Sequence, residues 1–289
     1  MKIFVINLER RPDRLLEIDS QLKKLGLDYQ RISAVDGSKL DSNFSEVDRQ
    51  QFRLNQRRDI GTGEIGCAES HKKVWRCMLN SHIEQALVLE DDALLDEKIV
   101  TLLSSEKIRC FDFVNLSEIS PYAVNSDSLQ TLVENNIWER PYFFQLGKRR
   151  IWRKIGWNKN WKRIYKNFFW RIFRLHQIEK NMFLLECDPV PMSSSSYIIS
   201  QNAAKCLLKI SSPTILPIDK TWQFANGGLI EAICYPALAK QSSNVSDIAV
   251  DRKVKRRLTL TERLKRIFYK NRRYNRVVDT IMMYGIRFF

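Results

Sequence analysis

Three consecutive carboxylates, Glu90, Asp91 and Asp92, directly follow a short apolar run at residues 86–89. Four apolar residues between polar segments predict a short buried strand. Carboxylates at the end of such a strand lie at the carboxyl edge of a sheet, where open α/β folds bind their ligands. Adjacent carboxylates repel one another, so they favour a hard divalent cation that also holds phosphates. The tripeptide alone also allows an acidic turn or helix N-terminus.

Strands and helices alternate along much of the chain. Further strands are predicted at residues 2–8, 29–32, 111–116 and 197–199. A helix starts near Pro12, with Gly26 as its C-terminal cap. Its apolar face is expected to contain Leu15, Ile18, Leu22 and Leu25.

A second helix is predicted to open at residues 63–64, and its apolar face includes Ile65, Ala68, Trp75 and Met78. His71 falls on the same side, where a core histidine with a structural hydrogen bond is expected. Residues 38–60 are polar and are predicted to form a loop. Repeated β-α-β units with short connections predict a Rossmann-like α/β fold, with a mostly parallel sheet flanked by helices.

The cysteine pattern and the hydropathy of the chain bear on where the protein resides and which kinds of site it contains. The six cysteines are scattered without a C-x-x-C pair, and with only three histidines they argue against a zinc site. The apolar run at the N-terminus is too short for a signal peptide, and no stretch approaches the ~20 residues of a membrane span. We therefore expect a cytoplasmic protein with free thiols.

The positive charge is concentrated in two segments. Residues 147–175 carry a charge of +11 and residues 251–289 a charge of +10, against +15 for the whole chain, so the remainder carries −6. Both segments mix Lys and Arg with aromatic residues that favour membrane interfaces. At about 1 kcal/mol per cation, such segments would hold the protein on an anionic membrane. Nucleic-acid binding and a solvated basic surface are the alternatives.

Several short motifs occur in order along the chain: INLER with Arg14, AVDG, GEIGCAESH, LEDDA, SYIIS, LPID and YPALAKQ, at residues 6–10, 34–37, 63–71, 89–93, 196–200, 216–219 and 235–241. Together they resemble the motifs of glycosyltransferase family 25, and the resemblance covers roughly residues 1–120 and 187–245. The sequence departs from the family at Glu69, where Leu is common, at Ser194 and Ser195, which replace Gly-Thr, and in the basic segment 147–175.

The resemblance implies a GT-A-like nucleotide-diphosphosugar fold over residues 1–245. From the charge pattern we expect a basic aromatic insertion at 147–175 within that domain and a basic helical tail at 246–289 that associates with a membrane. The resemblance also implies an inverting transfer of a hexose, with galactose as the expected sugar, from a UDP-sugar to a glycan or glycolipid in bacterial lipooligosaccharide, lipopolysaccharide or surface-polysaccharide biosynthesis. Because those acceptors are made at the inner face of the inner membrane, we expect peripheral attachment there and no nucleic-acid partner.

The same resemblance suggests roles for individual residues. Glu90 and Asp92 would bind Mn²⁺ or Mg²⁺, and Asp92 is the first choice for direct coordination. Asp219 would act as general base, with Glu231, expected on an exposed helix, as the weaker candidate. The predicted donor-binding residues are Asn7, Leu8, Arg10, Arg14, Ala34, Val35, Asp36, Glu90, Asp91, Gln241 and Ser242. For Arg10 and Arg14 a solvated helix face is the alternative, and for Asp36 a simple turn.

Two other classes of protein stay open at this point. A Mg²⁺-dependent phosphotransferase or hydrolase could use the same carboxylates, although the sequence has no P-loop. A non-enzymatic membrane- or nucleic-acid-binding protein would not need residues 90–92.

Overall fold

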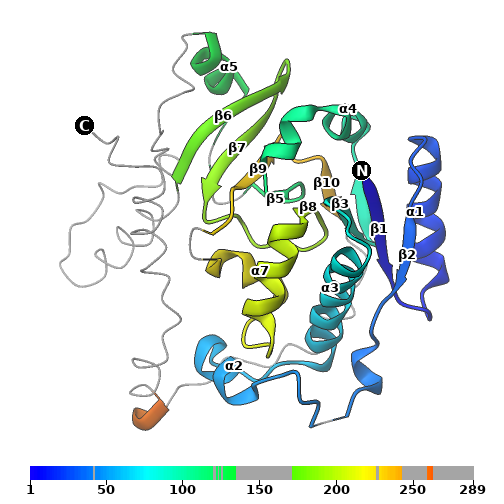
Figure 1. The fold of residues 1–289 in the computed structure, drawn as a ribbon, viewed down its shortest axis with the longest axis vertical. Coiled ribbons are helices and arrows are strands. Elements are labelled where there is room, and N and C mark those ends of the chain that lie inside the picture. Colours follow the sequence, from blue (N-terminus) through cyan, green and yellow to red (C-terminus); the bar gives the residue numbers. More distant parts are fainter. Residues whose placement is uncertain are drawn as a thin grey trace.

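The computed structural model describes residues 1–41, 43–119, 122, 124, 126–134, 171–225, 228–242 and 259–262. A central sheet of eight strands organises these residues (Figure 1). The strands are β1 (Lys2–Asn7), β2 (Gln30–Ser33), β3 (Gln85–Glu90), β5 (Phe113–Asn115), β6 (Arg171–Glu179), β7 (Met182–Asp188), β8 (Ser196–Ser200) and β9 (Glu231–Tyr235). Their order across the sheet is β2-β1-β3-β8-β5-β9-β7-β6.

The directions of these strands confirm the predicted α/β class. Strand β1 runs parallel to β2 and β3, and β5 runs parallel to β9. Strand β8 runs antiparallel to both of its neighbours, and so does β7. Six of the eight strands in the described sheet therefore point the same way. The carboxyl ends of β1, β2 and β3 consequently meet at one edge, which is where the candidate site lies.

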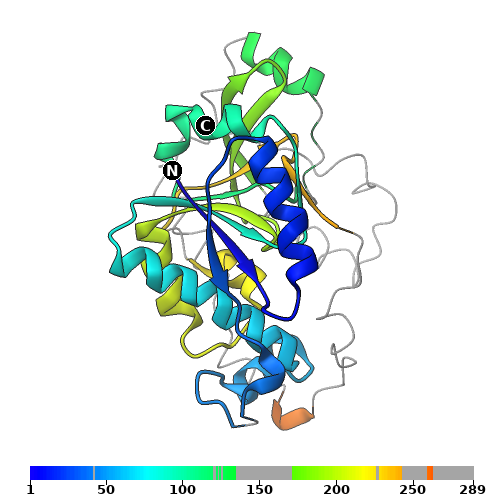
Figure 2. The same ribbon diagram turned by 90° about the vertical axis from the view of Figure 1, so that its right-hand side faces the viewer.

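Helices cover both faces of this sheet (Figure 1, Figure 2). They are α1 (Pro12–Lys24), α2 (Arg49–Gln56), α3 (Thr62–Asn80), α4 (Ile99–Ser104), α5 (Ser126–Glu134) and α7 (Gln201–Ser211), with 3-10 turns η1 (Gly37–Lys39), η2 (Glu106–Cys110) and η3 (Ile218–Phe224). Alternate residues of β1 point to opposite faces, so Phe4 joins the core under α3 and α7, whereas Val5 joins the core under α1 and α4.

The predicted helices around residues 12 and 63 are confirmed. In α1, Ile18 and Leu22 are buried, and Gly26 after the helix has a positive φ of 66°, which glycine adopts readily. In α3, the predicted apolar face is buried: Ala68, Trp75 and Met78 join the core under the sheet, whereas Ile65 joins a small separate cluster near α2.

The prediction of a loop at residues 38–60 is wrong, because this segment contains α2. Asp48 caps the helix by accepting a hydrogen bond from the Gln51 amide at 2.8 Å. Phe52 is fully buried in a small apolar cluster that also contains Val47 and Ile60. A short helix with two buried apolar side chains among many polar ones shows too little periodicity for the sequence pattern to reveal it.

A second, two-stranded sheet pairs β4 (Ala93–Leu95) antiparallel with β10 (Ala239–Gln241). Gln241, the last residue of β10, lies opposite Ala93 in this sheet, so the end of β10 lies beside the carboxylate run. Two elements separated by about half of the sequence thus contribute to one site.

The two basic segments fall largely outside the described residues. Residues 171–175 of the predicted insertion belong instead to the edge strand β6, which pairs with β7. Of the predicted tail, the structure describes residues 259–262 alone. All six cysteines lie in the described ranges and are free thiols. Within those ranges, no helix combines the length and apolar character needed to cross a bilayer.

Candidate active site

A pocket of about 300 Å³ lies at the carboxyl ends of β1, β2 and β3. Of the residues predicted from the sequence, its lining contains Leu8, Arg10, Arg14, Ala34, Val35, Asp36, Glu90, Asp91, Asp92 and Gln241. Asn7 and Ser242 are not part of this lining, but each forms a hydrogen bond with the carboxylate run. The fold thus brings together residues that the sequence separates by more than 200 positions.

Two glycines allow α3 to begin at the wall of this pocket. A Cβ atom on Gly37 would lie 1.8 Å from the Thr62 carbonyl oxygen, and one on Gly66 would lie 2.5 Å from the Val35 carbonyl oxygen. The loop after β2 therefore packs directly on the first turns of α3, and Thr62 and Gly63 reach the pocket. The exposed amides of a helix N-terminus favour anions, including phosphates.

Asp91 is held by buried polar groups. Its carboxylate accepts a hydrogen bond from Asn7 Nδ2 at 2.7 Å and lies 3.5 Å from Arg14 Nη1. Asn7 Oδ1 in turn accepts a bond from Arg31 Nε at 3.0 Å. Burial raises the pKa of Asp91, and the bond from Asn7 and the charge of Arg14 oppose this rise. The solvated alternative for Arg14 is excluded, because this side chain is buried.

Asp92 has one satisfied and one unsatisfied carboxylate oxygen. Oδ2 accepts a hydrogen bond from Gln241 Nε2 at 3.0 Å, and the backbone oxygen accepts one from the Ser242 amide at 2.8 Å. Oδ1 is buried and has no hydrogen-bond partner in the part of the chain that the structure describes. Burial and the charge of Glu90 raise the pKa of Asp92 to about 6. A buried carboxylate oxygen without a donor, beside two further carboxylates, fits a divalent cation.

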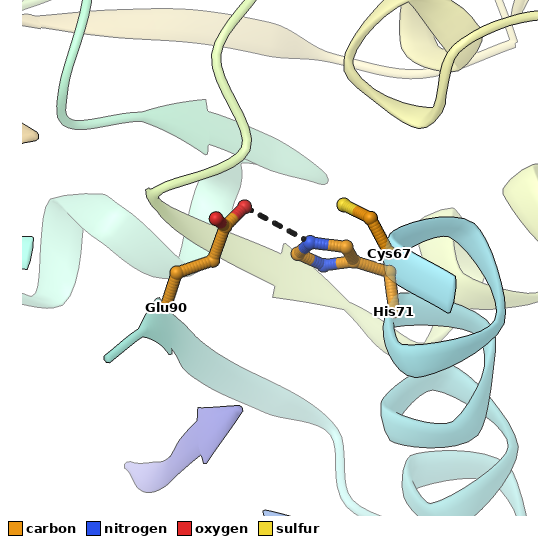
Figure 3. Close-up of side chains that lie close together, drawn as sticks. All are labelled: Cys67, His71 and Glu90. Carbon is orange, nitrogen blue, oxygen red and sulfur yellow. Dashed lines mark hydrogen bonds and ion pairs between the residues drawn. The ribbon is translucent and has the colours of Figure 1, made fainter. Parts of the chain in front are cut away.

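Glu90 ends a chain of hydrogen bonds, and Figure 3 shows its contact with His71. Its Oε1 atom accepts bonds from Ser194 Oγ and, at 3.2 Å, from His71 Nε2. Burial raises the pKa of Glu90, but the bonds from His71 and Ser194, together with the positive charges of His71 and Arg14, outweigh burial and leave the pKa lowered. In the neutral ring, Nδ1 then accepts a bond from Tyr197 Oη at 2.8 Å, and Tyr197 Oη accepts one from Trp75 Nε1 at 3.1 Å.

His71 was expected to be buried with a structural hydrogen bond, and both features are present. Three further features were not predicted: the other ring nitrogen reaches Glu90, and Cys67 and Ser70 also line the pocket. The spacing of Cys67 and His71 could have indicated that Cys67 lies beside His71, because residues four apart share a helix face.

Arg10 and Asp36 form an ion pair at the mouth of the pocket. Asp36 also accepts bonds from the hydroxyl and the amide of Ser38, so it caps η1 as the turn alternative predicted. The Ser38 hydroxyl and the Arg10 guanidinium lower the pKa of Asp36 to about 2.

Asp219 lies in the first turn of η3 and outside the pocket lining. Burial raises the pKa of the Cys67 thiol, and the charges of Glu90 and Asp219 raise it further. Asp219 is therefore within electrostatic reach of a side chain that lines the pocket. The expectation that Glu231 lies on an exposed helix is wrong: it is buried in strand β9, between β5 and β7.

Comparison with known proteins identifies relatives of this chain. The family described as "Glycosyltransferase family 25 (LPS biosynthesis protein)" matches residues 1–222. A "Glycosyltransferase 25 family member" of Drosophila pseudoobscura pseudoobscura is 30% identical over 145 residues, which cover 44% of this chain and 23% of that protein.

Two further relatives carry more specific names. The human "Procollagen galactosyltransferase 2" is 31% identical over 102 residues, covering 34% of this chain and 16% of that protein. The "Procollagen lysyl hydroxylase and glycosyltransferase" of Acanthamoeba polyphaga mimivirus is 31% identical over 165 residues, covering 49% and 18%. The chain thus spans less than a quarter of the length of these relatives.

Proposed function

This chain belongs to glycosyltransferase family 25, and we propose that it transfers galactose from UDP-galactose to a glycan or glycolipid acceptor, with inversion at the anomeric carbon. The observation that carries the proposal is the unsatisfied Asp92 Oδ1 atom beside Glu90, in a pocket at the carboxyl edge of the sheet. The choice of galactose is supported by relatives that are named galactosyltransferases.

In this proposal the donor occupies the pocket. Arg14, which is buried in the lining, and the first turn of α3 favour the diphosphate. The segment from Ala34 to Asp36 would bind the nucleoside. Glu90 and Asp92 would hold Mn²⁺ or Mg²⁺, which when bound neutralises the negative charge that grows on the departing diphosphate.

The acceptor requires a base, and Asp219 is our candidate. Its carboxylate would take the proton of the acceptor hydroxyl as that oxygen attacks the anomeric carbon from the face opposite UDP. The negative charge of Asp219 acts on Cys67, a pocket residue, and this supports the role.

The biological context of the proposal is the assembly of lipooligosaccharide, lipopolysaccharide or another surface polysaccharide, as the family description suggests. A glycolipid acceptor would lie at the cytoplasmic face of the inner membrane. The basic aromatic segments 147–175 and 251–289 would then hold the enzyme at that anionic surface as a peripheral protein.

Release of UDP in the presence of UDP-galactose, Mn²⁺ and a short sugar acceptor tests this function. Wild-type protein should release UDP only when acceptor and cation are both present, and EDTA should stop the reaction. Asp92→Asn should be inactive, whereas Asp28→Asn, an exposed carboxylate outside the pocket, should keep full activity. Activity that EDTA and Asp92→Asn leave intact would overturn the metal role. An unchanged melting temperature with every UDP-sugar and Mn²⁺ would overturn the donor.

A further inference from the structure

Cys67, His71 and Glu90 form a second group of metal-ligand atoms in the pocket wall (Figure 3). Cys67 and His71 are one turn apart on α3, and Glu90 is the last residue of β3. The sulfur, a ring nitrogen and a carboxylate oxygen all lie within 4.8 Å of one another. Figure 3 shows the thiol, the imidazole and the carboxylate gathered in the space between α3 and β3.

We propose that Cys67, His71 and Glu90 together bind one Zn²⁺ ion. Sulfur, nitrogen and oxygen donors are the ligands that zinc prefers, and three protein ligands with one open position are a recurring zinc arrangement. Tetrahedral zinc bonds separate neighbouring ligand atoms by roughly 3.3–3.8 Å. His71 Nε2 already lies 3.2 Å from Glu90 Oε1, so small side-chain movements would complete this geometry.

The surroundings of His71 and Glu90 support the site. A histidine bound to a metal through Nε2 carries its proton on Nδ1, and outer partners that accept a hydrogen bond from Nδ1–H orient the ring. Tyr197 Oη lies 2.8 Å from Nδ1 and can accept this hydrogen bond once its own hydroxyl hydrogen turns away. Ser194 Oγ bonds to Glu90 Oε1 and fixes the carboxylate.

Glu90 would then serve two different cations. The oxygen-only pair Glu90 and Asp92 suits Mn²⁺ or Mg²⁺, whereas the group with Cys67 and His71 binds Zn²⁺ more tightly than Mn²⁺. A bound Zn²⁺ draws Glu90 away from Asp92. Zn²⁺ is therefore an inhibitor of Mn²⁺-dependent transfer, a consequence that rests on the proposed function, whereas the zinc site itself does not.

Titration of the purified, metal-free protein with Co²⁺ tests the site without measuring activity. Wild-type protein should develop the near-ultraviolet sulfur-to-cobalt charge-transfer band, saturating at one Co²⁺ per chain, and Zn²⁺ should abolish it. Cys67→Ser should lose the band. Cys77→Ser, on the same helix but outside the cluster, should keep it. His71→Gln should weaken Co²⁺ binding by more than about 10-fold, because even outer-shell partners are worth about 10–100-fold.

A band that is absent from wild-type protein, or that persists in Cys67→Ser, overturns the zinc site. Circular dichroism of each variant ensures that a lost band reflects a lost ligand. The inhibitory consequence is measured as the fraction of each variant's own Mn²⁺-dependent rate that Zn²⁺ removes, which should be smaller in Cys67→Ser than in wild type. A cobalt band without any sugar transfer would refute the proposed function and support the zinc site. Sugar transfer without a cobalt band would support the proposed function and refute the zinc site.

Discussion

Replacing Asp92 by Asn should make the metal-free protein more stable while abolishing its response to cations. The pKa of Asp92 is raised from an ordinary 3.8 to about 6, chiefly by burial and by the charge of Glu90. Ionising this group in the folded protein therefore costs about 3 kcal/mol more than in the unfolded chain, at ~1.4 kcal/mol per pKa unit. Asn removes that cost and can still accept the bond from Gln241.

The sign of the pH dependence follows from the same values. Between pH 4 and pH 6 the folded protein holds a proton on Asp92 that the unfolded chain releases, so wild-type stability falls as pH rises through this window. Above pH 6 the folded protein bears the full cost of ionising Asp92. Asp92→Asn should therefore raise the free energy of unfolding by about 1–3 kcal/mol at pH 8, and by little at pH 4.

Urea unfolding of both proteins in EDTA at pH 4 and pH 8 measures this difference, with Asp28→Asn as the exposed control. Repeating the pH 8 series with Mn²⁺ should stabilise wild type and leave Asp92→Asn unchanged. If Asp92→Asn proved no more stable than wild type at pH 8, or gained equally at both pH values, Asp92 would not be the strained carboxylate that its geometry indicates.

Three further predictions follow from other parts of the molecule. Asp219→Asn should lower kcat by about 10²-fold and leave KM for the UDP-sugar unchanged; a raised KM with unchanged kcat would make Asp219 a donor contact. Gly66→Ala should lower the free energy of unfolding by about 1–3 kcal/mol or more, because the added Cβ atom would lie 2.5 Å from the Val35 carbonyl oxygen. The control Gly26→Ala has open space and a positive φ and should lose about 1 kcal/mol; equal losses would contradict the close packing. In co-sedimentation, the protein should bind anionic but not neutral vesicles, and salt or deletion of residues 251–289 should weaken this binding. Equal binding after the deletion would show that the tail does not contribute.

Sequence patterns predicted those elements that are continuous apolar runs or carry a regular apolar stripe. Strands β1 and β3 are short apolar runs buried on both faces, and α1 carries a regular apolar stripe, so period and composition were sufficient. Helix α2 was missed because its capping residue Asp48 and its one fully buried aromatic, Phe52, stand among polar residues. Strand β9 was missed because its first residue is the charged Glu231, which long-range strand pairing buries.

The candidate site was only partly accessible to such patterns. Motif positions brought together Arg10, Asp36 and the carboxylate run, and the fold assembles them around one pocket. The partners of each group depend instead on contacts between distant elements. His71 reaches Glu90 and Tyr197 because α3 crosses the sheet at this point, and no spacing within a single helix encodes that crossing.

The three adjacent carboxylates illustrate the difference most directly, because they are equivalent in the sequence and have different surroundings in the fold. Asp91 points to donors on β1 and α1, Glu90 points to donors on α3 and on the segment before β8, and Asp92 receives one side-chain donor from β10. Glu90 is the last residue of β3, whereas Asp91 and Asp92 lie in the turn that follows, so the three side chains meet different neighbours. Asp92 receives the fewest side-chain hydrogen bonds of the three, so its negative charge is the least compensated by the protein. Of the three carboxylates, Asp92 should therefore depend most on a bound cation.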